Sequence, residues 1–288
     1  MGSGLVKFMS ILFLLSKPIS LGKQCPLPPP LALSTNNQIQ NPVLFIFLGA
    51  SNLARSFYGL KRCIRRCIFP RPASFVHAMG PGRGYVSRGG ILNAIYSPIF
   101  NCGIFEAARN KRIENQQVVA LITDIGNDIM YNVSSEKIID VLQYIFNALD
   151  GFATNIFITP IPVDLENDIS EFYFKIIRQV YFPKSSVKYF QASNNIKTIN
   201  KFILQSSSQK VTVINDMKSF CGIDKIHYGI FKSQSAWSHI AGKLTASLGT
   251  NISPKLKTSE IALSMANNIA RILLTDMLGM ANKTNETF

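Results

Sequence analysis

The chain has 288 residues, enough for one sizeable α/β domain or at most two small ones. Hydrophobic residues make up 47% of it, which argues against global disorder. The formal net charge of +14 favours acidic partners such as nucleic acid, anionic lipid head groups or acidic glycans. No zinc-finger spacing or RNP-like aromatic motif accompanies this charge, so we expect no specific nucleic-acid binding.

The N-terminal segment is mostly apolar from Leu5 to Ser16, a stretch too short to span a bilayer comfortably. Either it is the core of a signal peptide cleaved near residues 20–22, or it is a disordered leader. The first reading makes the protein exported or membrane-associated through residues 5–22, and the second leaves it cytoplasmic. Membrane contact is expected only through this segment, if it stays uncleaved. Residues 23–41 are rich in proline and polar side chains, which predicts a linker.

From residue 42 apolar strand-forming runs alternate with helical patterns, which predicts a parallel sheet covered on both faces. Residues 42–250 form the predicted domain, and residues 251–288 a C-terminal helical extension. Residues 181–209, the least readable part, are expected to form a loop. The predicted strands are 43–48, 74–79, 117–123, 155–159 and 210–215. The predicted helices are 53–68, 134–149 with Ser134 as N-cap, 171–180, 234–248 and 258–280.

The five cysteines match no disulfide framework, and their number is odd. Cys63 and Cys67 lie four residues apart in a predicted helix, and we expect their thiols to pack against a neighbouring element. No Cys-x2-Cys spacing or nearby histidine pair supports a metal site. We therefore expect neither a metal nor a cofactor.

A serine stands where the first predicted strand turns into the first predicted helix, in Gly49-Ala50-Ser51. This position is the carboxyl edge of the sheet, where open α/β sheets bind ligands. It is also a helix N-terminus, which favours developing negative charge. A serine nucleophile further needs a base, a group that orients the base, and donors for the oxyanion.

Those three services can come from later loops. His227 is the candidate base, and Asp224, three residues earlier, can reach its Nδ1 through one tight turn. The Asn127 side chain, the Gly82 N–H and the Ser51 N–H are the candidate oxyanion donors. Loops that follow successive parallel strands open on one edge of the sheet, so these residues can converge.

Each part alone has a plain structural alternative. Ser51 could be a helix N-cap, Asn127 could belong to an ordinary turn, and Asp224 with His227 could form a surface ion pair. These three signals and Gly82, found together in the required chain order, are far more specific than any one of them.

The order Ser51, Gly82, Asn127 and Asp224-x-x-His227 resembles the SGNH (GDSL-like) hydrolase superfamily, in a sub-branch with Gly-Ala-Ser-Asn in its first block. The resemblance spans about residues 42 to 248. It implies a flavodoxin-like three-layer α/β/α fold with a five-stranded parallel sheet. It also implies Ser51 as the nucleophile, an Asp224–His227 pair, and an oxyanion hole made by Ser51, Gly82 and Asn127.

Two departures from the family pattern stand out. Ala50 occupies the place of the usual aspartate before the nucleophile, and the second block offers Gly80 and Gly84 as alternatives to Gly82. Arg83 and Arg88 flank this glycine loop, where they could select an anionic substrate or simply be solvated.

The expected function is hydrolysis of a small acyl or O-acetyl ester carried by a small molecule, glycan or lipid. One alternative is an O-acyltransferase that passes the same acyl group to a sugar or lipid. Another is a non-catalytic module that binds an anionic polymer through its basic surface, without need of Ser51.

Overall fold

The computed structural model describes residues 41–90, 95–229, 231–250 and 252–271. The predicted signal segment (5–22) and all but the last residue of the predicted linker lie outside the described residues. The same holds for residues 272–288 of the predicted C-terminal extension. Within the described ranges, no helix combines the length and apolar character needed to cross a membrane.

Five parallel strands form one sheet in the order β2-β1-β3-β4-β5. This is the strand order of flavodoxin-like folds, so the fold predicted from the sequence is confirmed. Each predicted strand lies within two residues of an observed one. The strands are β1 (Val43–Leu48), β2 (Ala73–Ala78), β3 (Gln117–Ile122), β4 (Asn155–Ile158) and β5 (Val211–Val213).

Strand β1, which lies between β2 and β3, is buried on both sides, with all six residues fully inaccessible. Its side chains alternate between the two faces of the sheet, as the pleat requires. Phe45 and Phe47 stack with Phe75 of β2 on one face, at centroid distances of 5.3 and 6.1 Å. A strand that is apolar at every position is typical of a parallel sheet with helices on both faces.

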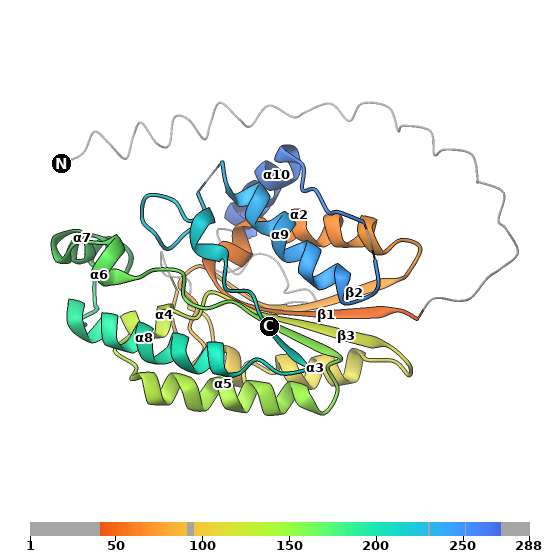
Figure 1. Cartoon of the computed structure of the whole chain (residues 1–288), viewed down its shortest axis with the longest axis horizontal. Coiled ribbons are helices and arrows are strands. Elements are labelled where there is room, and N and C mark those ends of the chain that lie inside the picture. Colours follow the sequence, from red (N-terminus) through yellow and green to blue (C-terminus); the bar gives the residue numbers. More distant parts are fainter. Residues whose placement is uncertain (1–40, 91–94, 230, 251, 272–288) are drawn as a thin grey trace, which may run out of the picture. The chain divides into compact units, whose positions relative to one another are not determined.

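Helices cover the two faces and the strand ends (Figure 1). α2, α9 and α10 share the core of Phe45 and Phe47. α3, α5 and α8 share the core of Leu44, Ile46 and Leu48, to which α4, α6 and α7 also contribute. The helices are α2 (Ser51–Ile68), α3 (Ile104–Lys111), α4 (Asn127–Met130), α5 (Ser135–Asp150), α6 (Leu165–Asp168), α7 (Glu171–Tyr181), α8 (Tyr189–Gln205), α9 (Ser233–Ala246) and α10 (Thr258–Arg271), with short 3-10 turns at Ile99–Asn101 and Met217–Phe220.

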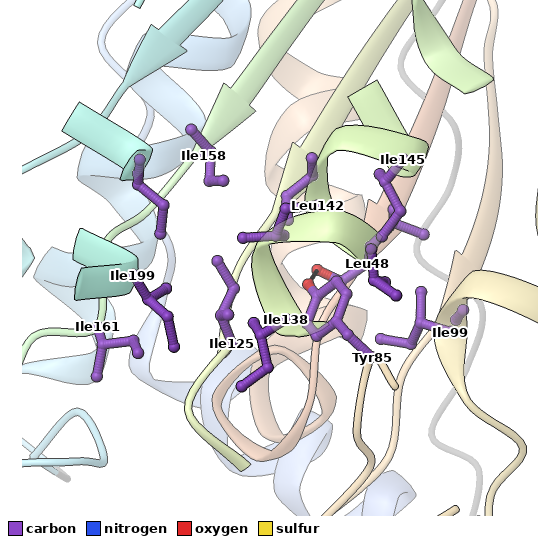
Figure 2. Close-up of a cluster of buried hydrophobic side chains, with 14 of the residues drawn as sticks. Leu48, Tyr85, Ile99, Ile125, Ile138, Leu142, Ile145, Ile158, Ile161 and Ile199 are labelled. Atoms are coloured by element: carbon purple, nitrogen blue, oxygen red, sulfur yellow. Dashed lines mark hydrogen bonds between the residues drawn. The ribbon is translucent and has the colours of Figure 1, made fainter. Parts of the chain in front are cut away.

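Tyr85 lies in the core that contains Leu44, Ile46 and Leu48, and it bonds to the ends of two strands (Figure 2). Its hydroxyl lies 2.9 Å from the carbonyl oxygen of Leu48 and 2.7 Å from that of Thr123. The ring is fully buried, so the polar group needs these partners. Tyr85 thereby fixes the ends of β1 and β3 next to each other.

The expectation of a loop over residues 181–209 is wrong, because α8 occupies Tyr189–Gln205. Ile196, Ile199 and Ile203 recur there at helical spacing and are buried. Polar residues fill most of the other positions, and Lys188 provides no side-chain cap, which hid the start of the helix. Ser134 caps α5 as predicted, accepting a hydrogen bond from the Lys137 N–H at 3.4 Å.

The described part of the C-terminal extension belongs to the helical layer of the domain. α10 lies against α2, where Ser264 Oγ accepts a hydrogen bond from the Gly59 N–H at 2.6 Å. Glu260 of α10 pairs with Arg66 of α2. Ile261 is buried in the same core as the residues of α2 and α9.

Candidate active site

Ser51 is the first residue of α2 and follows β1 after a two-residue turn. The turn is narrow: a Cβ at Gly49 would stand 2.9 Å from the Thr123 side chain and 3.0 Å from that of Leu53. Only glycine fits so close an approach. Glycine thus lets the chain bend sharply at the carboxyl end of β1 and presents the Ser51 hydroxyl at the sheet edge.

The side chains of Ser51, His227 and Asp224 form a continuous chain of hydrogen bonds, although Ser51 lies more than 170 residues before the other two. The Nε2 atom of His227 lies 2.9 Å from Ser51 Oγ, and its Nδ1 atom lies 2.6 Å from Asp224 Oδ2. The Tyr181 ring packs edge-on against the imidazole, with the two centroids 5.5 Å apart. The structure therefore brings together the nucleophile, base and acid that the sequence predicts.

Asp224 is held by the turn that carries His227. Its Oδ1 atom accepts hydrogen bonds from the N–H groups of Ile226 (3.1 Å) and His227 (2.9 Å). Lys225 takes a left-handed conformation (φ 59°) that makes this turn possible. Burial raises the pKa of the Asp224 carboxyl, but the His227 ring and the backbone donors outweigh it and bring the pKa down to about 2. Asp224 is thus ionised and fixed when it faces the imidazole.

Asn52, next to Ser51, joins the start of α2 to the segment that carries His227. Its Oδ1 atom accepts from the Tyr228 N–H at 3.0 Å, and its Nδ2 atom donates to the Ile226 carbonyl at 3.2 Å. The residues on both sides of His227 are therefore bonded to one side chain. This buried amide fixes the separation between His227 and Ser51.

Asp124, at the end of β3, provides the carboxylate that holds the N-terminus of α2. Its Oδ2 atom accepts from the N–H groups of Ala50 (3.0 Å) and Leu53 (3.1 Å), and its Oδ1 atom accepts from Asn52 Nδ2 at 2.9 Å. Sequence reasoning gave Asp124 no such role, because it looked for an acid directly before the serine and found Ala50. The acid comes instead from the neighbouring strand.

Asn127 faces the same space from the start of α4. Its Nδ2 atom donates to the Arg83 carbonyl at 3.0 Å, which fixes the orientation of the amide. Asn127 and Ser51 line one cavity. No intramolecular acceptor is found among the described residues for the Ser51 N–H, so it too can meet a ligand.

Glycine stands at each of the three positions of the second block for a different structural reason. A Cβ at Gly80 would stand 2.5 Å from the Tyr96 ring, and one at Gly84 would stand 2.5 Å from Asp128 Oδ1. Gly82 has a φ of 73°, and its carbonyl accepts from the Tyr131 hydroxyl at 2.5 Å. Its N–H has no acceptor within the described part of the chain. The role of Gly82 as an oxyanion donor stays a prediction.

Asp128 anchors this glycine loop from the interior. Its carboxylate is fully buried and accepts from the N–H groups of Tyr85 (2.5 Å), Val86 (3.1 Å) and Ser87 (2.8 Å). Burial raises the pKa of Asp128 to about 6, although the three backbone donors act in the opposite direction. Asp128 follows Asn127 directly, so the candidate amide donor and the loop anchor move as one unit.

The two arginines beside the loop differ in burial. Arg83 is 2% exposed, its Nε donates to the Ser97 carbonyl at 3.0 Å, and its guanidinium lies over the Tyr96 ring. This side chain does not line the cavity, and a substrate contact by Arg83 stays a prediction. Arg88 is exposed and does not line the cavity, so its role stays a prediction.

No cluster of histidine, cysteine, aspartate or glutamate suited to a metal ion is found in the ranges that the structure covers. The four described cysteines are free thiols. Burial raises the pKa of Cys63 to about 12 and that of Cys221 to about 11, so both thiols are neutral at physiological pH.

A cavity of about 90 Å³ opens beside Ser51. Its polar lining comes mostly from the segments that follow the strands, including the first residues of α2 and α4. Its apolar lining comes from those segments and from α4, α6, α7 and α8. Ile125 and Ile161, which Figure 2 places in the core between the sheet and α5 and α8, form part of its wall. The arrangement can hold a carbonyl group at Ser51 with an apolar group behind it.

No protein-family model and no curated protein sequence matches this chain. Solved structures do resemble it. It is similar to an acetyl esterase mutant bound to acetate, at 11% identity over 72% of this chain and 98% of the other, with a TM-score of 0.46. It is similar to a carbohydrate esterase of family 3 from Talaromyces cellulolyticus, at 13% identity with the same coverage and TM-score.

A third similar structure is a member of the lipolytic protein G-D-S-L family from Veillonella parvula, at 9% identity over 79% of this chain and 97% of the other, with a TM-score of 0.38. Identities this low carry no residue roles across, so the chemistry of this site is argued from its own atoms.

Proposed function

We propose that this protein is a serine hydrolase that cleaves carboxylic esters through an acyl-enzyme at Ser51. The observation that carries the proposal is the relay in which His227 Nε2 lies 2.9 Å from Ser51 Oγ and Nδ1 lies 2.6 Å from Asp224. Both distances are those of hydrogen bonds, as an activated nucleophile requires. A helix N-cap or a surface ion pair alone would not need this alignment.

Acylation follows from that geometry. Ser51 Oγ attacks the ester carbonyl carbon while its proton passes to His227 Nε2. Ionised Asp224 accepts a hydrogen bond from Nδ1–H, which leaves Nε2 free to take the proton and stabilises the imidazolium that forms. The imidazolium then gives its proton to the departing alcohol. In the second half-reaction His227 takes a proton from the water that attacks the acyl carbon. It then returns this proton to Ser51 Oγ as the acyl–oxygen bond breaks and the carboxylic acid leaves.

The developing oxyanion needs donors that are already in place. The Ser51 N–H, the Asn127 amide and the Gly82 N–H are our proposed set, in line with the resemblance that the sequence shows. The hydrogen bond from Asn127 to the Arg83 carbonyl supports this set, because it fixes the amide before substrate arrives. The N-terminus of α2 adds favourable potential at the same place.

The mechanism requires an ester carbonyl and leaves the alcohol open, so a small-molecule, glycan or lipid ester would meet it. The preference for a small acyl or O-acetyl group stays a prediction from the sequence. Its test is the dependence of kcat/KM on acyl length.

The proposal is tested by treating the purified protein with a fluorophosphonate and locating the adduct by mass spectrometry. We expect one adduct, on Ser51, and none in Ser51→Ala or His227→Ala. His239→Ala is the matched control: this half-buried histidine pairs with Asp216 and should leave labelling unchanged. Correctly folded protein that takes no adduct would contradict the proposal and favour a binding module.

A further inference from the structure

We propose that the apolar cavity beside Ser51 is an acyl pocket that selects an uncharged aliphatic chain of about four to six carbons over acetyl. This inference rests on the proposed function, because it names the acyl group that Ser51 would carry. It departs from the small-acyl preference that the sequence suggests.

The position of the cavity fits an acyl group. Ser51 and Asn127, the proposed nucleophile and an oxyanion donor, both line it. The polar lining residues follow the strand ends, whereas α7 and α8 contribute only apolar ones. A carbonyl held at Ser51 would therefore direct its alkyl chain away from the polar groups and towards these two helices.

The walls are apolar and fixed. Ile125, Ile161, Phe174, Ile177 and Ile196 line the cavity, and none is more than 8% exposed. Such residues gain free energy when they exclude water around an alkyl chain.

The lining offers nothing to a charged acyl group. Among the described residues that line the cavity, Asp124 alone carries a charge, and its oxygens already accept from Ala50, Leu53 and Asn52. A charged acyl group such as a dicarboxylic half-ester would lose its hydration without gaining a partner, which disfavours it strongly.

The volume sets the length. An apolar cavity of about 150 Å³ holds benzene in another protein, which is about 25 Å³ per carbon. By that measure, the 90 Å³ cavity holds about four carbons beyond the carbonyl. An acetyl group would place one methyl there and leave most of the cavity unfilled, and the walls would lose contacts they could make.

The first experiment is a series of p-nitrophenyl esters from acetyl to dodecanoyl. Each buried methylene should raise kcat/KM about fourfold until the cavity is full. We expect a rise from acetyl to about pentanoyl or hexanoyl and a plateau or fall beyond it. The p-nitrophenyl succinate half-ester, of similar size, should react far more slowly than the pentanoyl ester.

Two substitutions change the pocket in opposite directions. Gly126 has helical dihedral angles (φ −69°, ψ −14°), and a Cβ there would meet Ile161 Cγ2 at 3.6 Å, an ordinary contact. Gly126→Ala should therefore narrow the cavity without strain and lower the hexanoyl-to-acetyl ratio of kcat/KM about tenfold. Ile161→Ala should move the optimum to longer chains, since Asn200 holds the Ile161 backbone at both N–H and carbonyl and keeps the wall in place.

Ile145→Ala is the matched control. Ile145 is a fully buried isoleucine of α5 that does not line the cavity, and Figure 2 shows it across the cluster from Ile161. It should reduce stability as any buried Ile→Ala change does, yet leave the chain-length ratios within about twofold of the wild type.

The outcomes separate the two proposals. If Ser51 takes the fluorophosphonate adduct but kcat/KM falls steadily from acetyl onwards, the acyl pocket is wrong and the hydrolase stands. A preference for longer chains that neither Gly126→Ala nor Ile161→Ala shifts would also overturn the pocket. Absence of both adduct and hydrolysis at every length would overturn the hydrolase and the pocket together.

Discussion

The side chain of Asn52 accepts a hydrogen bond from the backbone N–H of Tyr228 at 3.0 Å, across 176 residues of sequence. One of these residues follows the proposed nucleophile and the other follows the proposed base. Their contact sets the distance over which a proton passes from Ser51 to His227. Positioning of the base thus depends on an amide whose oxygen and nitrogen are both bonded within the protein.

Asn52→Leu should lower kcat by tenfold or more and destabilise the fold by about 1–3 kcal/mol, because the buried Tyr228 N–H loses its acceptor. The variant that remains folded should still have a low kcat, because its base is misplaced. KM should change little, since substrate binding does not depend on the base. Steady-state kinetics and urea unfolding would measure the two effects. Asn110→Ala, at an exposed position of α3, is the control and should change neither.

Asp224→Asn should lower kcat about 10³- to 10⁴-fold with little change in fold. The amide oxygen can still accept from the backbone of the turn, but its NH2 group then faces Nδ1 and favours the tautomer that carries hydrogen on Nε2. Such an imidazole cannot take the Ser51 proton. Single-turnover kinetics would measure acylation, and Asp216→Asn beside His239 is the control. A loss of less than tenfold would contradict the assigned role.

Asn127→Ala should lower kcat about 10²- to 10³-fold, as expected when one oxyanion donor is removed. The variant also frees the Arg83 carbonyl, so a loop effect must be separated from a direct one. Tyr131→Phe provides that comparison, since it removes the bond to the Gly82 carbonyl without removing an oxyanion donor. We expect Tyr131→Phe to stay within about tenfold of the wild type. Equal losses in both variants would point to the loop alone.

The raised pKa of Asp128 predicts that the stability of the fold depends on pH. That pKa is about 6 in the folded protein against an ordinary value of 3.8. Between these values the folded state binds the proton that the unfolded chain has released, so the free energy of unfolding falls as pH rises from about 4 to about 6. The contribution is present below pH 4 and lost above pH 6, and its size is about 3 kcal/mol at most.

Asp128→Asn removes that titration and replaces one acceptor of the loop with a donor. Urea unfolding at pH 4, 5, 6 and 7 should show the stability difference between wild type and variant shrinking as pH rises. A difference that is constant over this range would show that Asp128 is ionised throughout. The low pKa of Asp224 acts below pH 4 and is common to both proteins, so it cancels.

The sequence predicts the fold well because β1 is apolar at every position and the other strands are mostly apolar. β1 needs no tertiary information to be recognised, and the alternation with helices follows from it. α8 was not predicted, because its buried residues Ile196, Ile199 and Ile203 lie among polar residues and the helix has no side-chain N-cap. Local patterns of this kind are weak where packing against α5, not propensity, stabilises the helix.

The site is predictable where its parts are local and less so where they depend on packing. The turn from Asp224 to His227 can be foreseen from a spacing of three residues. That Asp124 would cap α2, or that Arg83 would turn inward onto Tyr96, depends on how neighbouring strands and loops meet. A charge next to a motif is therefore a poor guide to whether its side chain faces the ligand.

The contact between α10 and α2 bears on how the protein should be produced. α2 begins with Ser51, and α10 covers one side of it. Glu260 forms an ion pair with Arg66 there, and Ser264 Oγ accepts a hydrogen bond from the Gly59 N–H. A recombinant fragment that stops at residue 250, the domain boundary suggested by the sequence, would leave this side of α2 bare. Cloning boundaries should therefore extend at least to residue 271, or an inactive preparation would reflect the truncation and not the chemistry.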